Sequence, residues 1–426
     1  MPDTQNEEFD FIKEKIKNKP INKKRLVRQA VKAAGLGVIF GVSACVAFTL
    51  LRPVLEEKFY EQEKPVYTIP KDTFDTETEQ QPQETEQQEP EEPDTQIVQV
   101  PRDLEVKDYQ KLQNKLYAIG IQANSSIVTV TGVKSDMDWF NSPYETEGQT
   151  CGIVIVKSTD EILIMTEQKI IQDANAITVT FCNGSVVSAQ LKKYDGNTGI
   201  AILSVPLEAL DEVMVDSVLP VELGNSYQVS QGDVVIAVGS PLGSNYSILT
   251  GNITSTNNSV STLDASFTVF TTDIVGSMDG SGVLLNLRGQ VVGLIMQDYG
   301  SKGEENTLTA FSISELKEII ELLSNDQNIG YLGLKVSTVT SDIEKEYELP
   351  RGVYIKYVEM DSPALAAGLQ NGDVIVSLDD DKIVTVEQYQ QYIRELPAGT
   401  TLKIGIMRQG NDGYTELTCT AEIGTL

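Results

Sequence analysis

Short β-branched segments separated by turn residues fill the middle of the chain and point to a mainly β fold. Four of them read SSIVTVTGV, CGIVIVKS, AITVTF and SVVSAQL. This spacing is typical of the strands of a sandwich or a barrel. Asn183-Gly184 lies between two segments and favours a tight hairpin, because both residues tolerate positive φ. We predict a β domain over residues 103–326, opened and closed by helices; the pattern alone fits a binding sandwich as well as an enzyme barrel.

The N-terminal quarter has three parts of contrasting composition. Residues 1–32 contain a basic stretch, residues 33–51 are uncharged and apolar, and residues 52–102 are rich in Glu, Gln, Thr and Pro. The apolar run is close to the roughly 20 residues that cross a bilayer. With its basic flank it predicts a cytoplasmic tail, a transmembrane helix and an extracytoplasmic bulk of the chain. A cleaved signal peptide is the alternative, and the acidic part predicts a disordered stalk.

The chain contains no histidine, and 62 acidic against 33 basic residues give it a formal net charge of -29. No Ser-His-Asp or Cys-His mechanism is open to it, because histidine is the general base in both. The negative charge argues against nucleic acid as a partner. Asp379–Asp381 is interpreted as a solvated turn, so neither a metal nor a cofactor is expected.

Two of the four cysteines, Cys151 and Cys182, lie in the β region. Their spacing fits neither a CxxC motif nor a disulfide-dense scaffold. A bridge between them is left open, and separate buried thiols are the favoured interpretation.

Three longer strings resemble the HtrA-type trypsin-like serine proteases. GQTCGIVIV is similar to the family's G-S-G-F strand, and GDVVIAVGSPLG to its G-x-x-V-x-A-I-G-N-P-L-G segment. TTDIVGSMDGSGVLLNLRGQVVGLI is similar to the stretch that carries the family's nucleophile. The resemblance runs from about residue 124 to the end of the chain. It implies a trypsin-like double antiparallel β-barrel with a cleft between the barrels.

The resemblance also locates three catalytic positions, and none carries the family's residue. Gln168 stands in place of the histidine, Gly199 of the aspartate and Gly280 of the serine. Glutamine cannot take a proton at neutral pH, and glycine has no side chain. Met278 replaces a glycine of the oxyanion hole. The resemblance therefore implies a degenerate triad, in a homologue of serine endopeptidases that is not itself an enzyme.

One alternative keeps a catalytic role for this loop. Ser277 or Ser281 would supply the nucleophile and Lys169 the base, as in Ser-Lys enzymes. The arrangement requires a one-residue shift at both motifs. Turn chemistry in a glycine-rich loop is the simpler explanation of the two serines.

Residues 327–426 resemble the PDZ domain that follows the protease in this family. YLGL is similar to its carboxylate-binding loop, and VEQYQQYIREL to its groove helix. PDZ domains add an extended peptide to a sheet edge and hold its terminal carboxylate with loop amides. The resemblance implies that Tyr331, Leu332, Gly333 and Leu334 bind peptide. The alternative is that the two leucines are core residues and Gly333 a tight turn.

The combined expectation is a membrane-anchored, extracytoplasmic pseudoprotease that acts as a peptide-binding scaffold or regulator. Its expected partners are polypeptide C-termini or unfolded protein segments, bound by the PDZ domain. The resemblance also suggests a homotrimer or an assembly with an active HtrA paralogue. The alternative function is a residual or unconventional serine endopeptidase in protein quality control.

Overall fold

The structure is a computed structural model, and the chain divides into two compact units, Met1–Pro65 and Val66–Leu426. In the first unit the few described residues between 28 and 43 are helical. No helix among the described residues is long and apolar enough to cross a bilayer, and the span predicted over 33–51 lies mostly outside them. The structure describes residues 28, 31–32, 35, 42–43, 65–72, 105–137, 143–299, 306–411 and 413–426.

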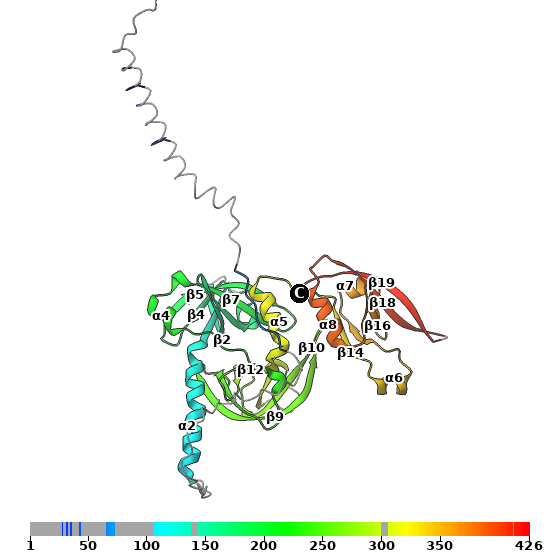
Figure 1. The fold of residues 1–426 in the computed structure, drawn as a ribbon, viewed down its shortest axis with the longest axis horizontal. Coiled ribbons are helices and arrows are strands. Elements are labelled where there is room, and N and C mark those ends of the chain that lie inside the picture. The colour runs from blue at the N-terminus through cyan, green and yellow to red at the C-terminus, as the bar shows by residue number, and fades with distance from the viewer. Residues whose placement is uncertain are drawn as a thin grey trace, which may run out of the picture. The chain divides into compact units, whose positions relative to one another are not determined.

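The first sheet of the second unit has seven antiparallel strands in the order β5-β4-β1-β2-β3-β7-β6; β2, β4, β5 and β7 are labelled in Figure 1. Its central strands bury both faces: Leu163 of β3 joins one core cluster, and its neighbours Ile162 and Ile164 join another. A strand covered on both sides needs an uninterrupted apolar run, which the sequence supplies as ILIM. The strands are β1 (Ile127–Met137), β2 (Pro143–Lys157), β3 (Glu161–Glu167), β4 (Ala176–Thr180), β5 (Val186–Ser188), β6 (Gln190–Asp195) and β7 (Ile200–Pro206).

The next six strands close into an antiparallel barrel in the order β10-β13-β12-β11-β8-β9. Leu284, Ile295 and Ala310 lie in a core cluster of this barrel. Leu285, Leu294 and Phe311, each next to one of them in sequence, lie in a cluster shared with the first sheet. The strands are β8 (Val234–Ser240), β9 (Ser247–Ser261), β10 (Ser266–Val275), β11 (Ser281–Leu285), β12 (Val291–Met296) and β13 (Thr307–Ser312).

Only one of the two predicted barrels is closed by hydrogen bonds. The first sheet ends at β5 and β6, which do not pair with each other among the described residues. Only Ala189 separates these two strands, and a single residue is too short for a hairpin turn. The chain therefore joins the two edges of the sheet covalently, and the prediction of two closed barrels is corrected to one.

Helix α5 closes the β domain and contacts strands of both sheets, β6, β7 and β12 (Figure 1). Its buried side chains include Leu316, Ile320 and Leu323, at the spacing of one helical face. The helices are α2 (Val106–Ala123), α3 (Gln168–Ile171), α4 (Glu212–Ser217), α5 (Ile313–Ser324), α6 (Ser341–Tyr347), α7 (Pro363–Ala366) and α8 (Val386–Glu395). Short 3₁₀ turns are η1 (Asn124–Ser126), η2 (Leu207–Ala209), η3 (Ser226–Gln228) and η4 (Gln297–Tyr299).

A short segment from the predicted stalk, residues 66–72, is packed against α5. Tyr67 and Ile69 are buried in the domain core. The Tyr67 amide donates to Asn325 Oδ1 over 2.7 Å, and Asn325 Nδ2 donates back to the Tyr67 carbonyl over 2.7 Å. This segment, which we name the strap, is therefore part of the folded domain rather than of an extended stalk.

The C-terminal domain is an α+β unit around one antiparallel sheet, ordered β14-β15-β16-β18-β19, with β17 beside β16. Tyr389 and Ile393 of α8 pack on this sheet in a separate core cluster. Among the described residues β14 pairs along its length only with β15, so no strand pairs with its outer edge, where the Leu334 carbonyl accepts a hydrogen bond from the Asp264 amide. The strands are β14 (Leu334–Thr338), β15 (Val353–Val358), β16 (Val374–Leu378), β17 (Asp381–Lys382), β18 (Thr401–Gly410) and β19 (Gly413–Glu422).

Candidate functional site

Two of the three positions predicted for a triad are adjacent in the structure. Gln168 begins α3 directly after β3, and Gly199 immediately precedes β7, which pairs with β3. The Gln168 amide donates to the Gly199 carbonyl over 2.8 Å. The backbone thus brings the positions expected for the base and its orienting partner together. Their side chains are the neutral amide of Gln168 and the single hydrogen atom of Gly199.

The third position, Gly280, is buried in a tight turn before β11. Its amide donates to the Ser277 carbonyl over 2.8 Å, and the Ser277 amide donates to the Pro241 carbonyl over 2.9 Å. A Cβ atom built on Gly280 would lie 2.8 Å from the Pro241 carbonyl oxygen and 2.8 Å from the Ser277 carbonyl oxygen. This loop conformation has no room for any side chain at the nucleophile's position.

The same turn removes a donor from the expected oxyanion hole. In trypsin-like enzymes the hole uses the amide of the nucleophile and that of the residue two positions before it. Here the Gly280 amide is already bonded inside the loop. The Met278 side chain is 67% exposed. At most one of the two donors remains for an oxyanion.

The two serines weighed as substitute nucleophiles occupy different environments. Ser281 is 2% exposed at the start of β11, and its Oγ accepts hydrogen bonds from Thr150 Oγ1 at 3.1 Å and the Cys151 amide at 3.2 Å. Ser277 is half-buried, and its Oγ accepts from the Asp279 amide at 3.3 Å. No base touches either hydroxyl among the described residues. Both serines satisfy local backbone and side-chain donors.

Lys169, the base of that alternative, is engaged elsewhere. Its Nζ lies 2.7 Å from Glu167 Oε2. A lysine paired with a carboxylate is stabilised in its charged form, and a charged lysine cannot accept the proton of a serine hydroxyl.

A very small cavity lies next to the predicted triad positions. Cys151, Thr166, Glu167 and Ser281 line a cavity of about 10 Å³, at the lower limit for one water molecule. Burial raises the pKa of the Cys151 thiol, so it stays protonated and unreactive. Cys151 and Cys182 are both free. Only Cys151 is buried, so the interpretation of two buried thiols is wrong for Cys182, which is exposed.

The predicted peptide-binding loop forms a cluster of backbone donors in the C-terminal domain. The Leu332, Gly333 and Leu334 amides converge on a single carboxylate, at donor–acceptor distances of 2.7, 2.6 and 3.0 Å. Gly333 has φ +91°, and its Cβ would lie 2.4 Å from Ser362 Cβ, so glycine is required there. The loop has the geometry of a carboxylate site.

The four predicted loop residues play unequal parts. The Tyr331 amide donates to the Gly424 carbonyl over 3.0 Å and is not part of the donor cluster. Leu332 and Leu334 have fully buried side chains, so the core interpretation is right for their side chains while their amides face the carboxylate. Of the four residues, Leu332, Gly333 and Leu334 form the donor cluster with their amides, while the Tyr331 amide is bonded to Gly424.

The carboxylate held by the loop belongs to Asp264, in the turn between β9 and β10 of the barrel. Asp264 is 7% exposed, and its own amide donates to the Leu334 carbonyl over 2.6 Å. The Tyr389 hydroxyl on α8 donates to the same carboxylate. Burial raises the pKa of Asp264 above its usual value, and the hydrogen bonds from the loop amides and Tyr389 offset only part of that increase. No motif in the sequence points to this residue.

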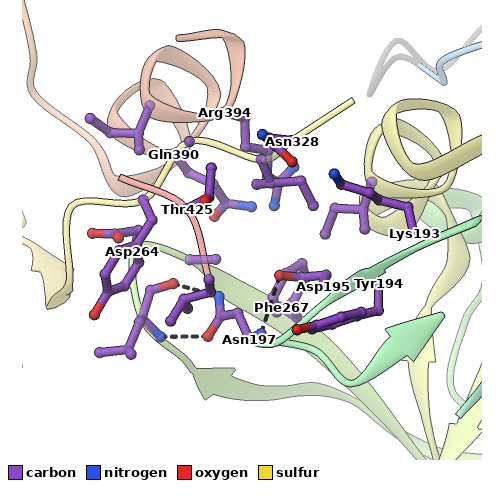
Figure 2. Close-up of a pocket in the computed structure, with 18 residues that line it drawn as sticks. Lys193, Tyr194, Asp195, Asn197, Asp264, Phe267, Asn328, Gln390, Arg394 and Thr425 are labelled. Atoms are coloured by element: carbon purple, nitrogen blue, oxygen red, sulfur yellow. Dashed lines mark hydrogen bonds between the residues drawn. The ribbon is translucent and has the colours of Figure 1, made fainter. Parts of the chain in front are cut away.

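A small pocket lies beside this contact, where the barrel meets the C-terminal domain. Figure 2 shows Asp264, Asn197, Gln390 and Arg394 around it. Asn197 fixes the turn that carries Asp264: its Nδ2 donates to the Leu263 carbonyl over 2.6 Å, and the Leu263 amide donates to Asn197 Oδ1 over 3.0 Å. The cavity of about 30 Å³ holds about one water molecule and is too small for a peptide.

Comparison with known families gives two domain matches. A model of the trypsin-like peptidase domain matches residues 150–294, and a model of the PDZ domain matches residues 330–418. The sequence resemblance to both domains is therefore confirmed.

Curated relatives agree with these matches. A serine protease Do-like HtrA of Lactobacillus helveticus is 28% identical over 289 residues, 64% of this chain and 68% of the relative. A serine protease Do-like HtrB of Bacillus subtilis (strain 168) is 26% identical over 294 residues, 64% of this chain and 62% of the relative. A probable periplasmic serine endoprotease DegP-like of Pseudomonas fulva (strain 12-X) is 30% identical over 272 residues, which are 62% of this chain and 54% of the relative. The chain spans less than two thirds of the last two relatives.

Solved structures show the same fold. The HtrA-type protease AlgW with decapeptide matches with a TM-score of 0.52 and 21% identity, over 73% of this chain and 98% of that one. The same protease with tripeptide matches with a TM-score of 0.52 and 22% identity, over 73% of this chain and 97% of that one.

Proposed function

Because the chain pairs a trypsin-like peptidase domain with a PDZ domain and its homologues are named HtrA and DegP-like serine proteases, we propose that it is a catalytically silent member of this group. Its PDZ domain binds polypeptide C-termini, and its protease domain serves as a scaffold or regulator. One observation carries the proposal. Gln168, Gly199 and Gly280 replace the triad, and the Gly280 turn leaves no space for a nucleophile's side chain.

The chemistry of peptide hydrolysis supports the silent assignment. A serine hydroxyl attacks a carbonyl only when a base takes its proton, and the developing oxyanion needs preorganised donors. The chain has no histidine, and Lys169 is ion-paired with Glu167. The amide of Gly280 is consumed inside its own turn. Both the general base and the oxyanion donors are therefore compromised.

The alternative function, a residual serine endopeptidase, rests on Ser277 or Ser281. Ser281 is buried and accepts two hydrogen bonds, which leaves its oxygen no path to a substrate. Ser277 is half-buried and faces the Asp279 amide. Either serine would need a new loop conformation to act, so we favour the scaffold.

Peptide binding is supported by the loop and by the edge strand that follows it. The three converging amides match what a terminal carboxylate requires. The outer edge of β14 offers the main-chain donors and acceptors that an added strand uses. Relatives of this fold were solved with a decapeptide and a tripeptide. We assign polypeptide C-termini as the ligand class.

The cellular setting is part of the proposal. The apolar segment 33–51 follows a basic stretch, and we propose that it anchors the chain with its bulk outside the cytoplasm. Assembly as a homotrimer or with an active HtrA paralogue is the corresponding proposal for its partners. Co-purification of the tagged chain from membranes tests both, and recovery of the chain in the soluble fraction alone would contradict the anchor.

The direct test combines peptide binding with active-site labelling. A fluorescein-labelled decapeptide pool with a free C-terminal leucine is titrated with the purified full chain, beside the same pool with an amidated C-terminus. We expect saturable binding of the free-acid pool only. A fluorophosphonate probe in parallel should label trypsin and leave this chain unlabelled. Equal binding of both pools would contradict the carboxylate site, and labelling of Ser277 or Ser281 would contradict the silent assignment.

A further inference from the structure

The carboxylate loop of the PDZ domain is already filled in this structure by a residue of the same chain. Asp264 receives the amides of Leu332, Gly333 and Leu334, and the Tyr389 hydroxyl adds a fourth donor. The side chain is 7% exposed, so no second carboxylate has access to these donors at the same time. The loop can therefore bind either Asp264 or the carboxylate of a peptide, but not both at once.

The contact copies the two features by which a peptide end is recognised. A C-terminal residue offers a backbone amide and a carboxylate separated by one carbon atom. Asp264 offers a backbone amide and a carboxylate separated by two. Its amide donates to the Leu334 carbonyl over 2.6 Å while its carboxylate fills the donor cluster. The Leu334 carbonyl belongs to the first residue of β14, where an added strand would begin to pair.

The turn that carries Asp264 also lies against α8, the helix that the sequence resemblance assigns to the peptide groove. The Ser266 amide donates to Gln390 Oε1 over 3.1 Å, and the Phe267 ring lies 5.6 Å from the Arg394 guanidinium. The turn therefore contacts both the loop and the helix that would border a bound peptide. It occupies the carboxylate end of the groove.

We propose that Asp264 is an internal pseudo-ligand that holds the PDZ domain closed and that peptide C-termini bind by displacing it. This inference rests on the proposed peptide-binding function and adds its regulation. When only a fraction of molecules has an open loop, the apparent dissociation constant for a peptide rises by the inverse of that fraction. Removing the Asp264 carboxylate should therefore tighten peptide binding without adding any contact to the peptide.

Asn197 provides a second way to release the turn. It lies between β6 and β7 of the seven-stranded sheet and fixes the Leu263 backbone through hydrogen bonds of 2.6 and 3.0 Å. Within the described part of the chain its hydrogen bonds are to Asp195, Thr262, Leu263 and Tyr299, and none is to the peptide loop or to α8. Asn197→Ala should loosen the turn, leave every group of the groove in place, and so tighten peptide binding for the same reason as Asp264→Ala.

The test measures half-saturation concentrations for the free-acid leucine decapeptide pool with four versions of the full chain. They are the wild type, Asp264→Ala, Asn197→Ala and the control Asp216→Ala. Asp216 is exposed on α4, so its removal makes the same charge change away from the groove. We expect about tenfold tighter binding for Asp264→Ala, a smaller gain in the same direction for Asn197→Ala, and no change for the control.

The outcomes separate this inference from the proposed function. Equal half-saturation for the wild type, Asp264→Ala and Asn197→Ala would overturn the pseudo-ligand while leaving peptide binding intact. Absence of saturable binding in every variant would overturn the peptide-binding function itself. If Asp264→Ala does not fold, as judged by its thermal unfolding, hydrogen exchange in the wild type decides. Peptide should then raise exchange of the Asp264 and Leu263 amides, and unchanged exchange at saturating peptide would contradict displacement.

Discussion

At the scale of single residues, Gly280 does more than omit a nucleophile. Its Cβ position lies 2.8 Å from two carbonyl oxygens, so Gly280→Ser forces the turn to move. We expect the variant to lose about 1–3 kcal/mol of unfolding free energy, the usual cost of overpacking, and to gain no activity. Urea unfolding and fluorophosphonate labelling measure the two effects. Wild-type stability together with labelling at residue 280 would show that the turn accommodates a serine.

A second variant in the same loop tests whether the stability loss of Gly280→Ser comes from steric crowding or from a general sensitivity of the loop to substitution. Ser277→Ala removes a hydroxyl that accepts one hydrogen bond, from the Asp279 amide at 3.3 Å. We expect it to cost less than about 1 kcal/mol, because the bond is long and half-exposed. A larger loss than for Gly280→Ser would contradict the steric explanation.

Glu161 gives a prediction with a definite pH dependence. Burial raises its pKa, but hydrogen bonds from Lys192, Ser204 and Tyr67 outweigh burial, and the net pKa is lowered. A carboxyl whose folded pKa lies below its unfolded value stabilises the fold above the unfolded pKa, about 4.3 for Glu. That stability disappears as pH falls through the folded pKa.

Glu161→Gln should therefore lose about 1–2 kcal/mol of unfolding free energy at pH 7. The difference from the wild type should shrink as pH falls from 6 toward 3.5. Urea unfolding at several pH values measures it, with the exposed Glu208→Gln as control. A difference that stays constant with pH would mean that the ionised carboxylate contributes no stability.

Individual residues also show where sequence reasoning succeeds and fails. The adjacency of Gln168 and Gly199 follows from local motifs on paired strands, and the resemblance located both. Asp264 carries no local signal, because the amides it binds lie 68 to 70 residues away in the next domain. A contact of that kind depends on how the two domains dock, and no periodicity or motif in the sequence encodes it.

At the scale of elements, the strap shows how a small apolar motif can be missed in a polar segment. Its composition predicts disorder, but Tyr67 and Ile69 are buried and Asn325 bonds the Tyr67 backbone at both its amide and its carbonyl. These contacts, together with the hydrogen bond from the Ile69 amide to Glu321 and the ion pairs Lys71–Glu318 and Lys317–Asp72, hold the seven residues against α5. The average composition of residues 52–102 gives no sign of these two apolar side chains.

The strap should loosen when Asn325, one of its hydrogen-bond partners, is removed. Asn325→Ala leaves the Tyr67 amide and carbonyl without partners, so we expect a loss of about 1–3 kcal/mol in unfolding free energy. Trypsin cleavage after Lys71, which forms an ion pair with Glu318, should become several times faster than in the wild type. Asn257→Ala, an exposed asparagine on β9, is the control. Unchanged cleavage in Asn325→Ala would contradict the role of Asn325.

The two sheets show a second limit of sequence reasoning. Alternating β-branched segments predicted the strands and the mainly β class, but not which sheet closes. Closure depends on the connection at Ala189, where one residue separates β5 from β6. Strand patterns give the faces of a sheet, whereas loop length decides which edges can pair.

At the scale of the whole molecule, the chain has a trypsin-like peptidase domain and a PDZ domain, while Gln168, Gly199 and Gly280 stand at the three positions predicted for a triad. The core clusters beneath both domains are well buried, and the carboxylate loop is complete. The site that has lost its side chains and the site that has kept its donors lie in different domains. This division is the basis on which we propose a binding rather than a hydrolytic role.

The most direct test of that role is digestion of unfolded casein by the full chain, followed by mass spectrometry of the products. We predict no new peptides beyond those of casein alone, and the Ser277→Ala/Ser281→Ala double variant should behave identically. Peptides produced by the wild type and absent with the double variant would show that the protein is an enzyme and would contradict the account.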